Sequence, residues 1–137
     1  MKAKIVLVAP EAVDFLPIQA LKYLDDGLRK SPTSDLTLKH AISDAKNGFG
    51  EIILAIVDEK ISGAAYFSYG EGENGKILCV TSLGGDNFKD WKQQIYDFTK
   101  ELAKTRGCAM IMLITREGWG KIFPDLQPIG TVYKLEV

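Results

Sequence analysis

Few side chains in this sequence have the chemistry of a nucleophile or a metal ligand. It contains one histidine, His40, and two cysteines, Cys79 and Cys108. A zinc site takes four Cys or His ligands, or three with an open position, and these residues include no closely spaced pair. We therefore expect no metal site and interpret both cysteines, which lie in apolar segments, as buried reduced thiols. His40 falls off the apolar stripe of its predicted helix, which favours an exposed side chain over a catalytic base.

Two short motifs have residue types that suit ligand binding. Gly84-Gly85 follows a predicted strand, where two glycines either let phosphate groups approach the backbone or form a tight turn. Arg116-Glu117-Gly118-Trp119-Gly120 combines an arginine with a tryptophan between glycines. Exposed Arg and Trp side chains are enriched in contact sites, so Arg116 and Trp119 are candidates for a partner contact. The alternative is that Trp119 packs onto the core.

Composition limits the class of protein. The chain has 137 residues, a net charge of −1, 46% hydrophobic and 26% charged residues, so we expect a single globular domain over 1–137 rather than a disordered chain. The 17 positive and 18 negative charges nearly cancel, which argues against a nucleic-acid partner. The apolar runs Ile5–Pro10 and Ile52–Val57 are too short to cross a membrane, and the first is too short for a secretory signal. We expect a cytoplasmic location and leave homo-oligomers through sheet edges open.

The first third of the chain predicts a strand followed by two helices. Lys4–Ala9 is rich in β-branched residues and ends at a proline, as expected of a short strand. Leucines and alanines at helical spacing predict a helix over 15–30, with Pro17 in its first turn. A second helix follows and ends near residue 48. The expected capping residues are Asp14 for the first helix, Thr33 or Ser34 for the start of the second, and Gly48 for its end.

The rest of the chain predicts five strands and two further helical segments. Short polar connections join Glu51–Val57, Ile61–Tyr69 and Lys76–Leu83, which predicts an antiparallel meander. A long helix capped by Asp86 or Asn87 should bury Phe88, Trp91, Ile95, Phe98 and Leu102 on one face. The next strand, Cys108–Ile114, should lie beside Lys76–Leu83 and parallel to it, because strand–helix–strand units form such crossovers. The tail predicts a helical turn around Trp119–Phe123 and an alternating strand, Thr131–Val137.

This element order, β-α-α-β-β-β-α-β-α-β, resembles the GNAT superfamily, the fold of the acetyl-CoA-dependent N-acetyltransferases, over essentially the whole chain. In Glu101–Ile114, Ala103 and Gly107 repeat the small-residue-x-x-x-glycine helix ending that precedes the family's fifth strand. The resemblance implies an α/β (α+β) fold with a mixed, mostly antiparallel sheet and helices on both faces.

A more specific resemblance is to small GNAT-like proteins encoded by tailed bacteriophages. It is carried by Leu83-Gly84-Gly85, Trp91, Gly107-Cys108 and Arg116-Glu117-Gly118-Trp119. The resemblance implies a place in the virion or in the cytoplasm of the infected host, with phage proteins as partners.

The resemblance also implies where acetyl-CoA would bind. In the family the pyrophosphate of acetyl-CoA meets the N-terminus of the long helix at an Arg/Gln-x-x-Gly-x-Gly/Ala loop. Counting back from Ala103 places that pattern on Asn87–Lys92, where Asp90 and Lys92 replace the two glycines. A carboxylate repels a pyrophosphate and bulky side chains obstruct it, so we expect weak acetyl-CoA binding or none. If the cofactor does bind, the candidate contacts are Leu83, Gly84, Gly85 and Asn87.

The family's acid and base are also missing from their usual places. The fourth strand, Lys76–Leu83, has no carboxylate to serve as a general base, and Lys121–Leu126 has no tyrosine to serve as a general acid. Catalytic residues therefore stay unknown. The first hypothesis is a GNAT-fold phage protein that is non-catalytic, a virion or accessory component. The second is a divergent acetyl-CoA-dependent N-acyltransferase acting on a primary amine. The third is a peptide or protein interaction module, because the family's sheet splays between its fourth and fifth strands.

Overall fold

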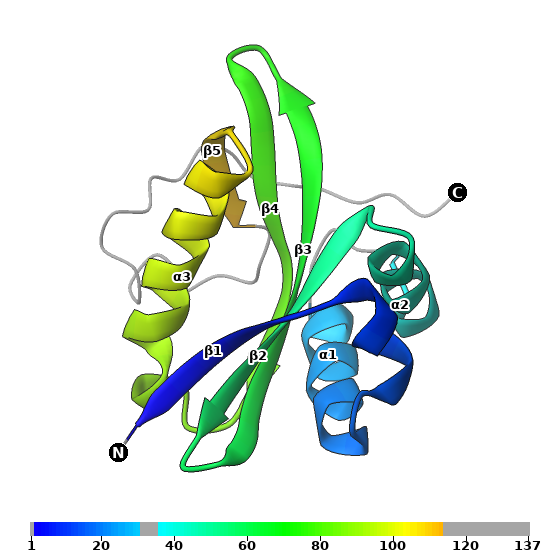
Figure 1. Cartoon of the computed structure of the whole chain (residues 1–137), viewed down its shortest axis with the longest axis vertical. Coiled ribbons are helices and arrows are strands. Elements are labelled where there is room, and N and C mark those ends of the chain that lie inside the picture. Colours follow the sequence, from blue (N-terminus) through cyan, green and yellow to red (C-terminus); the bar gives the residue numbers. More distant parts are fainter. Residues whose placement is uncertain (1, 31–35, 114–137) are drawn as a thin grey trace.

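A computed structural model describes residues 2–30 and 36–113 of the chain (Figure 1). The expected strands up to residue 113 and the three main helices are all present. In chain order the elements are β1 (Ala3–Val8), the 3₁₀-helix η1 (Pro10–Phe15), α1 (Ile18–Lys30), α2 (Leu38–Lys46), β2 (Gly50–Val57), β3 (Lys60–Gly72), β4 (Gly75–Gly85), the 3₁₀-helix η2 (Phe88–Asp90), α3 (Lys92–Thr105) and β5 (Cys108–Leu113). The tail elements predicted at Trp119–Phe123 and Thr131–Val137, and the caps Thr33 and Ser34, lie outside the described residues.

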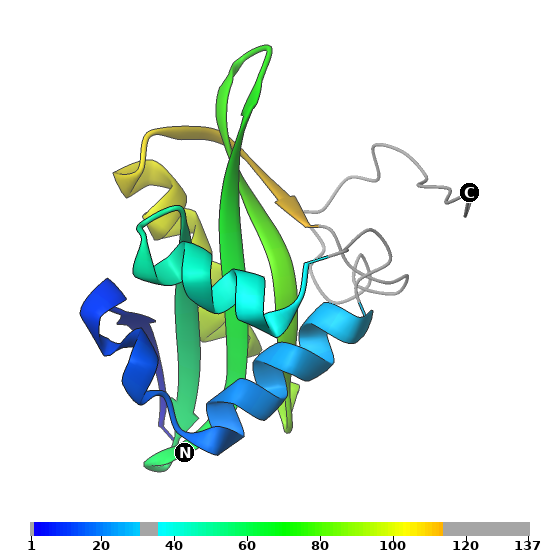
Figure 2. The ribbon, with the colours of Figure 1, turned by 90° about the vertical axis from the view of Figure 1, so that its right-hand side faces the viewer.

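The strands form one mixed sheet in the order β1-β2-β3-β4-β5. The first four are antiparallel neighbours, and β5 runs parallel to β4. This confirms the predicted parallel pair at Lys76–Leu83 and Cys108–Ile114, within the part of it that is described. Figures 1 and 2 show α3 on one face of the sheet and α1 and α2 on the other. The fold class predicted from the sequence, a mostly antiparallel sheet with helices on both faces, is therefore confirmed.

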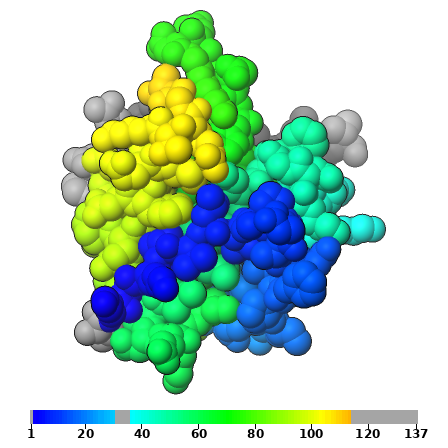
Figure 3. All heavy atoms as spheres, viewed as in Figure 1, coloured from blue at the N-terminus to red at the C-terminus, as the bar shows by residue number. Residues whose placement is uncertain are grey.

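Two hydrophobic cores lie on the two faces of the sheet. Along β2, Ile52 and Leu54 contribute to the core under α1 and α2, whereas Ile53 and Ala55 contribute to the core under α3. The predicted buried face of α3 is also confirmed: Trp91, Ile95 and Leu102 are buried, and Phe88 and Phe98 pack against them while partly exposed. Figure 3 shows β1 passing between α3 and η1, with the β3–β4 hairpin projecting beyond the rest of the molecule.

The first helix begins later than the sequence indicated. Residues 10–15 form the 3₁₀-helix η1, which buries Val13, and α1 starts at Ile18. Asp14 lies within η1 and its carboxylate pairs with Lys46 at 3.1 Å, so the prediction that it caps α1 is wrong. Pro17 precedes α1, and its carbonyl accepts the N–H of Leu21 at 3.2 Å.

The caps of α2 and α3 differ from the predictions in a similar way. Thr37 caps α2, because its Oγ1 accepts the N–H of His40 at 3.3 Å, whereas Gly48 follows the C-cap with φ 79° as expected. His40 itself is exposed, as predicted. Neither Asp86 nor Asn87 caps α3, which begins at Lys92 after η2.

Two negative findings apply to residues 2–30 and 36–113. No helix in these ranges is both long and apolar enough to cross a membrane. The same ranges contain no group of three His, Cys, Asp or Glu side chains arranged to hold a metal ion.

Candidate functional site

β4 extends beyond its described pairing with β5. β4 pairs with β5 only from Lys76 to Val80, although β4 continues to Gly85. Within the described residues, Thr81–Gly85 therefore have no strand partner on the β5 side. A β-bulge lies at the same point, because Val80 and Ser82 pair with successive residues of β3 and leave Thr81 as the extra residue. Bulges bend a strand and increase its twist, which directs this part of β4 away from β5.

The bulge carries small polar groups rather than a strong acid or base. The hydroxyls of Ser68 and Thr81 are hydrogen-bonded at 2.8 Å, and the Thr81 hydroxyl donates to the Cys79 carbonyl at 3.4 Å. Burial raises the pKa of the Cys79 thiol, and the Ser68 hydrogen bond offsets this only in part. Cys79 therefore stays a protonated thiol at neutral pH and is a poor nucleophile. Cys79 and Cys108 are both free thiols, as expected, but half-buried rather than buried.

Gly84 and Gly85 allow other parts of the chain to approach β4 closely. A Cβ at Gly84 would lie 2.3 Å from the carbonyl oxygen of Tyr23 on α1. One at Gly85 would lie 2.3 Å from the carbonyl oxygen of Ser62 on β3 and 2.9 Å from the ring of Trp91. Both glycines lie within β4 and pair with β3, so the interpretation that they form a tight turn is wrong; the close approach of other parts of the chain explains the absence of side chains. Leu83 next to them packs against the core under α3.

The segment 86–91, which joins β4 to α3, uses three of its backbone N–H groups within the protein. Asp86 donates to the Ser62 carbonyl at 2.8 Å, Asp90 to the Asn87 carbonyl at 2.8 Å, and Trp91 to the Phe88 carbonyl at 3.0 Å. A phosphate-binding loop needs such N–H groups to point at the ligand. These three N–H groups of the 86–91 segment are therefore directed at acceptors within the protein.

Trp91 turns inward from this segment. Its side chain is 1% exposed and its Nε1–H donates to the Asp86 carbonyl at 2.9 Å. It meets the ring of Phe88 edge-on, with ring centroids 4.7 Å apart, a favourable aromatic geometry. A Cβ at Gly63 on β3 would lie 2.4 Å from the indole, so the absence of a side chain there makes room for it. The sequence predicted the burial of Trp91 but not the glycine that faces it.

Tyr23 of α1 also contacts the segment. Its hydroxyl donates to Asp86 Oδ2 at 2.8 Å. Burial raises the pKa of Tyr23, and the hydrogen bond to the Asp86 carboxylate adds to the rise. Sequence reasoning missed this contact, because no spacing rule connects residues 63 positions apart.

The residues aligned with the family's phosphate loop lie along this closed segment. Asn87 is exposed with a left-handed backbone, φ 52° and ψ 44°. Asp90 ends η2, and Lys92 is the first residue of α3. The N–H groups in the first turn of α3 are the donors that a helix leaves without intrahelical acceptors, and they remain the anion-attracting element here. Arg116 and Trp119, the candidate partner contacts, lie outside the described residues.

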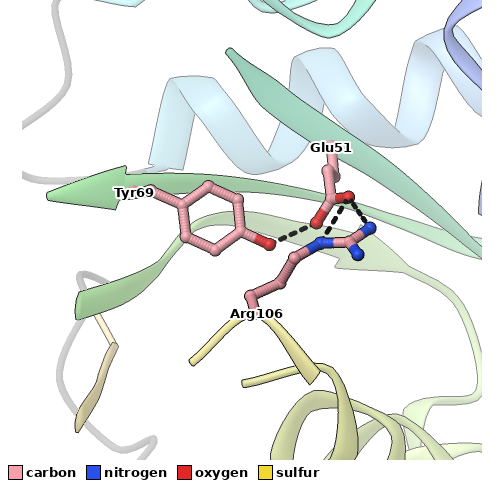
Figure 4. A network of polar contacts seen from close by, with 3 residues as sticks. All are labelled: Glu51, Tyr69 and Arg106. Atoms are coloured by element: carbon pink, nitrogen blue, oxygen red, sulfur yellow. Dashed lines mark hydrogen bonds and ion pairs between the residues drawn. The ribbon is translucent and has the colours of Figure 1, made fainter. Parts of the chain in front are cut away.

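A second polar cluster lies at the other end of α3 (Figure 4). The carboxylate of Glu51 on β2 accepts the hydroxyl of Tyr69 on β3 and the Nε–H of Arg106, the latter at 3.2 Å. Burial, and then the Glu51 carboxylate, raise the pKa of Tyr69. Lys76 lies 4.5 Å from the centre of the Tyr69 ring. Each polar group in the cluster is satisfied by another, so its role is to join the α3–β5 turn to β2 and β3.

The mixed five-stranded sheet with helices on both faces is the fold of the GNAT acetyltransferases. No protein-family model and no curated protein matches the sequence. Among solved structures, the chain is similar to a predicted acetyltransferase with acetyl-CoA from Clostridium acetobutylicum, with a TM-score of 0.69, 13% identity, and 98% and 96% of the two chains covered.

Two further structures agree with this assignment of the fold. A ribosomal-protein-alanine N-acetyltransferase from Brucella melitensis matches with a TM-score of 0.67, 13% identity, and 99% and 98% of the chains covered. A GNAT family acetyltransferase from Staphylococcus aureus matches with a TM-score of 0.63, 15% identity, and 98% and 100% covered. At these identities the similarity establishes the GNAT fold, and function has to be argued from the site.

Proposed function

We propose that this chain is a GNAT-fold protein that does not transfer acetyl groups, and that it acts as a non-catalytic virion or accessory component of a phage. The observation that carries the proposal is the conformation of the 86–91 segment, which the sequence resemblance aligns with the family's pyrophosphate loop. Three properties of the segment disfavour the binding of a CoA pyrophosphate: its backbone donors, its side-chain volume and its charge.

Three backbone donors of the segment are already used within the protein. Asp86, Asp90 and Trp91 donate their N–H groups to carbonyls within the protein. Binding a pyrophosphate through them requires breaking these bonds first, which lowers the affinity by the free energy of each bond lost.

Side-chain volume and charge act in the same direction. The buried indole of Trp91, which packs against Gly63 and Gly85, anchors the segment in its present conformation. Asp90 brings a carboxylate to the N-terminal end of α3, where it competes with an anionic ligand for the helix dipole. Lys92 brings a cation, but a long side chain stands where the family has a small residue.

The chemistry available at the bulge of β4 also supports a non-catalytic role. Acetyl transfer to an ammonium group needs a proton acceptor. The described strand β4 has Cys79, Thr81 and Ser82 around the bulge and no carboxylate. Because the pKa of Cys79 is raised, its thiol stays protonated at neutral pH and is not available to accept the proton.

The phage assignment rests on the sequence resemblance, and the packing gives a physical reason for part of that pattern. Gly85 of the Leu-Gly-Gly motif and Trp91 are partners in one contact, since the missing Cβ at Gly85 admits the indole. Two features of the phage-like pattern, the glycine pair and the tryptophan, thus belong to one packing unit. We expect a chain that retains the contact between Gly85 and Trp91 to retain the closed 86–91 segment.

Isothermal titration calorimetry with acetyl-CoA and with CoA tests the proposal. We expect no heat of binding from the wild-type protein up to millimolar ligand, with an active GNAT enzyme as the positive control. Saturable binding at a low micromolar Kd would contradict the proposal. In that case the second candidate takes its place.

The second candidate is a divergent acetyl-CoA-dependent N-acyltransferase acting on a primary amine. The β4 residues from Thr81 to Gly85, which have no partner on the β5 side within residues 2–30 and 36–113, favour it, because an extended ligand can hydrogen-bond to such strand groups. Holding a neutral amine next to a thioester supplies much of the rate by proximity alone, so water could accept the proton. Release of free CoA thiol from acetyl-CoA in the presence of a primary amine, above the rate without protein, would support this candidate.

A further inference from the structure

Asp86 joins three elements through three different groups. Its N–H donates to the Ser62 carbonyl on β3 at 2.8 Å, and its own carbonyl accepts Trp91 Nε1–H at 2.9 Å. Its Oδ2 accepts the hydroxyl of Tyr23 on α1 at 2.8 Å. One residue thus fixes the 86–91 segment to β3, to α1 and to the start of α3.

Unusual backbone conformations occur on both sides of Asp86. Gly85 has φ 152° and Asn87 has φ 52°. A left-handed conformation is uncommon for a residue other than glycine, although asparagine tolerates it better than most. Asn87 makes no side-chain capping bond that would stabilise it there. The conformation is therefore held by its neighbours, and positions 85 and 87 are where the chain can rotate once those contacts are lost.

The exposure of these residues indicates which contacts open most readily. Asp86 and Asn87 are exposed, whereas Trp91 is 1% exposed. Hydrogen bonds near solvent open at lower free energy than those in a core. Removing the Trp91 indole from its place exposes apolar surface, so the closed state is the major one and the open state a minor one.

We infer that Asp86 is a latch that holds the 86–91 segment against β3 and α1. When it releases, the segment rotates at Gly85 and Asn87, and Trp91 leaves its position over Gly63. The inference rests on the proposed function, because it concerns the closed segment that the proposal assigns to the place where a GNAT enzyme would meet a diphosphate. It concerns an equilibrium of the protein without ligand.

Native-state hydrogen exchange, measured with no CoA present, tests the latch. The variants are Asp86→Ala, which removes the carboxylate, and Tyr23→Phe, which removes only its hydroxyl partner. Asp90→Asn is the matched control, since it removes a charge from the same segment without touching the three contacts. We expect the amides of Asp90 and Trp91 to exchange about tenfold faster in both latch variants, the effect of losing one hydrogen bond to a charged group.

The exchange rates of the β2 amides distinguish local opening of the 86–91 segment from destabilisation of the whole domain. Ile53 and Leu54 lie in the central sheet, and their exchange should stay at the wild-type rate if only the segment opens. A second readout is acrylamide quenching of Trp91 fluorescence in a Trp119→Phe background, which should increase in both latch variants. Asp90→Asn should change neither measurement.

Two outcomes would overturn the latch. One is an Asp90 and Trp91 exchange rate in Tyr23→Phe that equals the wild-type rate. The other is an equal increase in the exchange rates of the Asp90, Trp91 and β2 amides, because such an increase would report global unfolding. Tyr23→Phe keeps the test valid if Asp86→Ala does not fold. The latch and the proposed function fail separately, since acetyl-CoA binding to the wild-type protein would contradict the proposed function and leave the exchange result unaffected.

Discussion

At the scale of the residue, Trp91 connects the core to the segment that precedes α3. It is among the largest fully buried side chains, and its indole N–H donates a hydrogen bond to the carbonyl of Asp86. We expect Trp91→Ala to lower the free energy of unfolding by about 3–5 kcal/mol, as for other buried aromatic truncations. Trp91→Phe keeps a ring in the site and should cost less. Denaturant titration checks both, and a loss below about 1 kcal/mol for Trp91→Ala would contradict the buried position.

Tyr69 gives a second prediction, on the pH dependence of stability. The ordinary pKa of tyrosine is 10.0, and burial together with Glu51 raises the pKa of Tyr69 in the folded state. The folded state therefore favours the neutral phenol. Its contribution to the free energy of unfolding is present in full below pH 10 and is lost as the pH rises from 10 towards the pKa of Tyr69 in the folded state. The slope stays below the ~1.4 kcal/mol per pH unit of one fully linked proton, because the site is partly exposed to solvent.

Comparing the wild-type protein with Tyr69→Phe isolates this effect from other groups that titrate at high pH. Tyr69→Phe should be less stable than wild type at pH 8, since Glu51 loses a donor. The difference between the two should shrink as the pH rises from 10 to 11.5. Urea unfolding across that range measures it, and a difference that does not change with pH would count against the Tyr69–Glu51 bond.

The same residues show what the sequence could and could not reveal about the site. The spacing of Phe88, Trp91 and Ile95 was enough to predict a buried helical face. The contacts of Trp91 with Gly63 and of Tyr23 with Asp86 join positions far apart in the chain. Such pairs depend on how the sheet and α1 pack, and that information is absent from local spacing.

At the scale of the element, α1 and β4 approach each other unusually closely. A Cβ at Gly27 would lie 2.3 Å from the Ser82 hydroxyl, and one at Gly84 would lie 2.3 Å from the Tyr23 carbonyl. Ser82, which is buried, donates its hydroxyl to the Leu24 carbonyl of α1 at 3.2 Å. Glycines on both elements and a polar bond between them therefore set the distance between α1 and the sheet.

Gly84→Ala should separate this packing role from a cofactor role. The added methyl meets backbone atoms, which cannot move aside as a flexible side chain can, so we expect a loss of about 1–3 kcal/mol in unfolding free energy. Gly70→Ala is the control, because Gly70 also lies in a strand but a methyl group there would meet no atom of another residue within 4 Å, its chain neighbours aside. It should be neutral or slightly stabilising. Equal midpoints for the two variants in urea would show that α1 does not pack on Gly84.

Elements were predicted more reliably than their ends. Apolar runs such as that of β2 are long enough to indicate a strand, and the parallel β4–β5 pair followed from the crossover rule. The starts of α1 and α3 were placed too early, since a 3₁₀-helix precedes each of them. A 3₁₀-helix of three or six residues is too short for a periodic pattern, and capping residues such as Asp14 have alternative partners in the fold.

At the scale of the whole molecule, one sheet is shared by two cores. Successive residues of β2 and β3 point to opposite faces, so Ala64 and Tyr66 enter the core under α1 and α2, and Ala65 and Phe67 enter the core under α3. Loss of either core removes packing from β2 and β3, and these strands also form the other core. The two faces should therefore unfold together, as expected of a domain of this size.

One truncation in each core tests this coupling. Leu24 is 0% exposed on the α1 face and Ile95 is 4% exposed on α3. Leu24→Ala and Ile95→Ala should each lower the unfolding free energy by about 2–5 kcal/mol. In both variants, far-ultraviolet circular dichroism and Trp91 fluorescence, read in a Trp119→Phe background, should give the same midpoint. If Leu24→Ala lowered the dichroism midpoint while the Trp91 signal unfolded at the wild-type denaturant concentration, the α3 face would be a separate folding unit. The closed 86–91 segment would then depend on α3 and β3 alone, without the support of α1 through Tyr23.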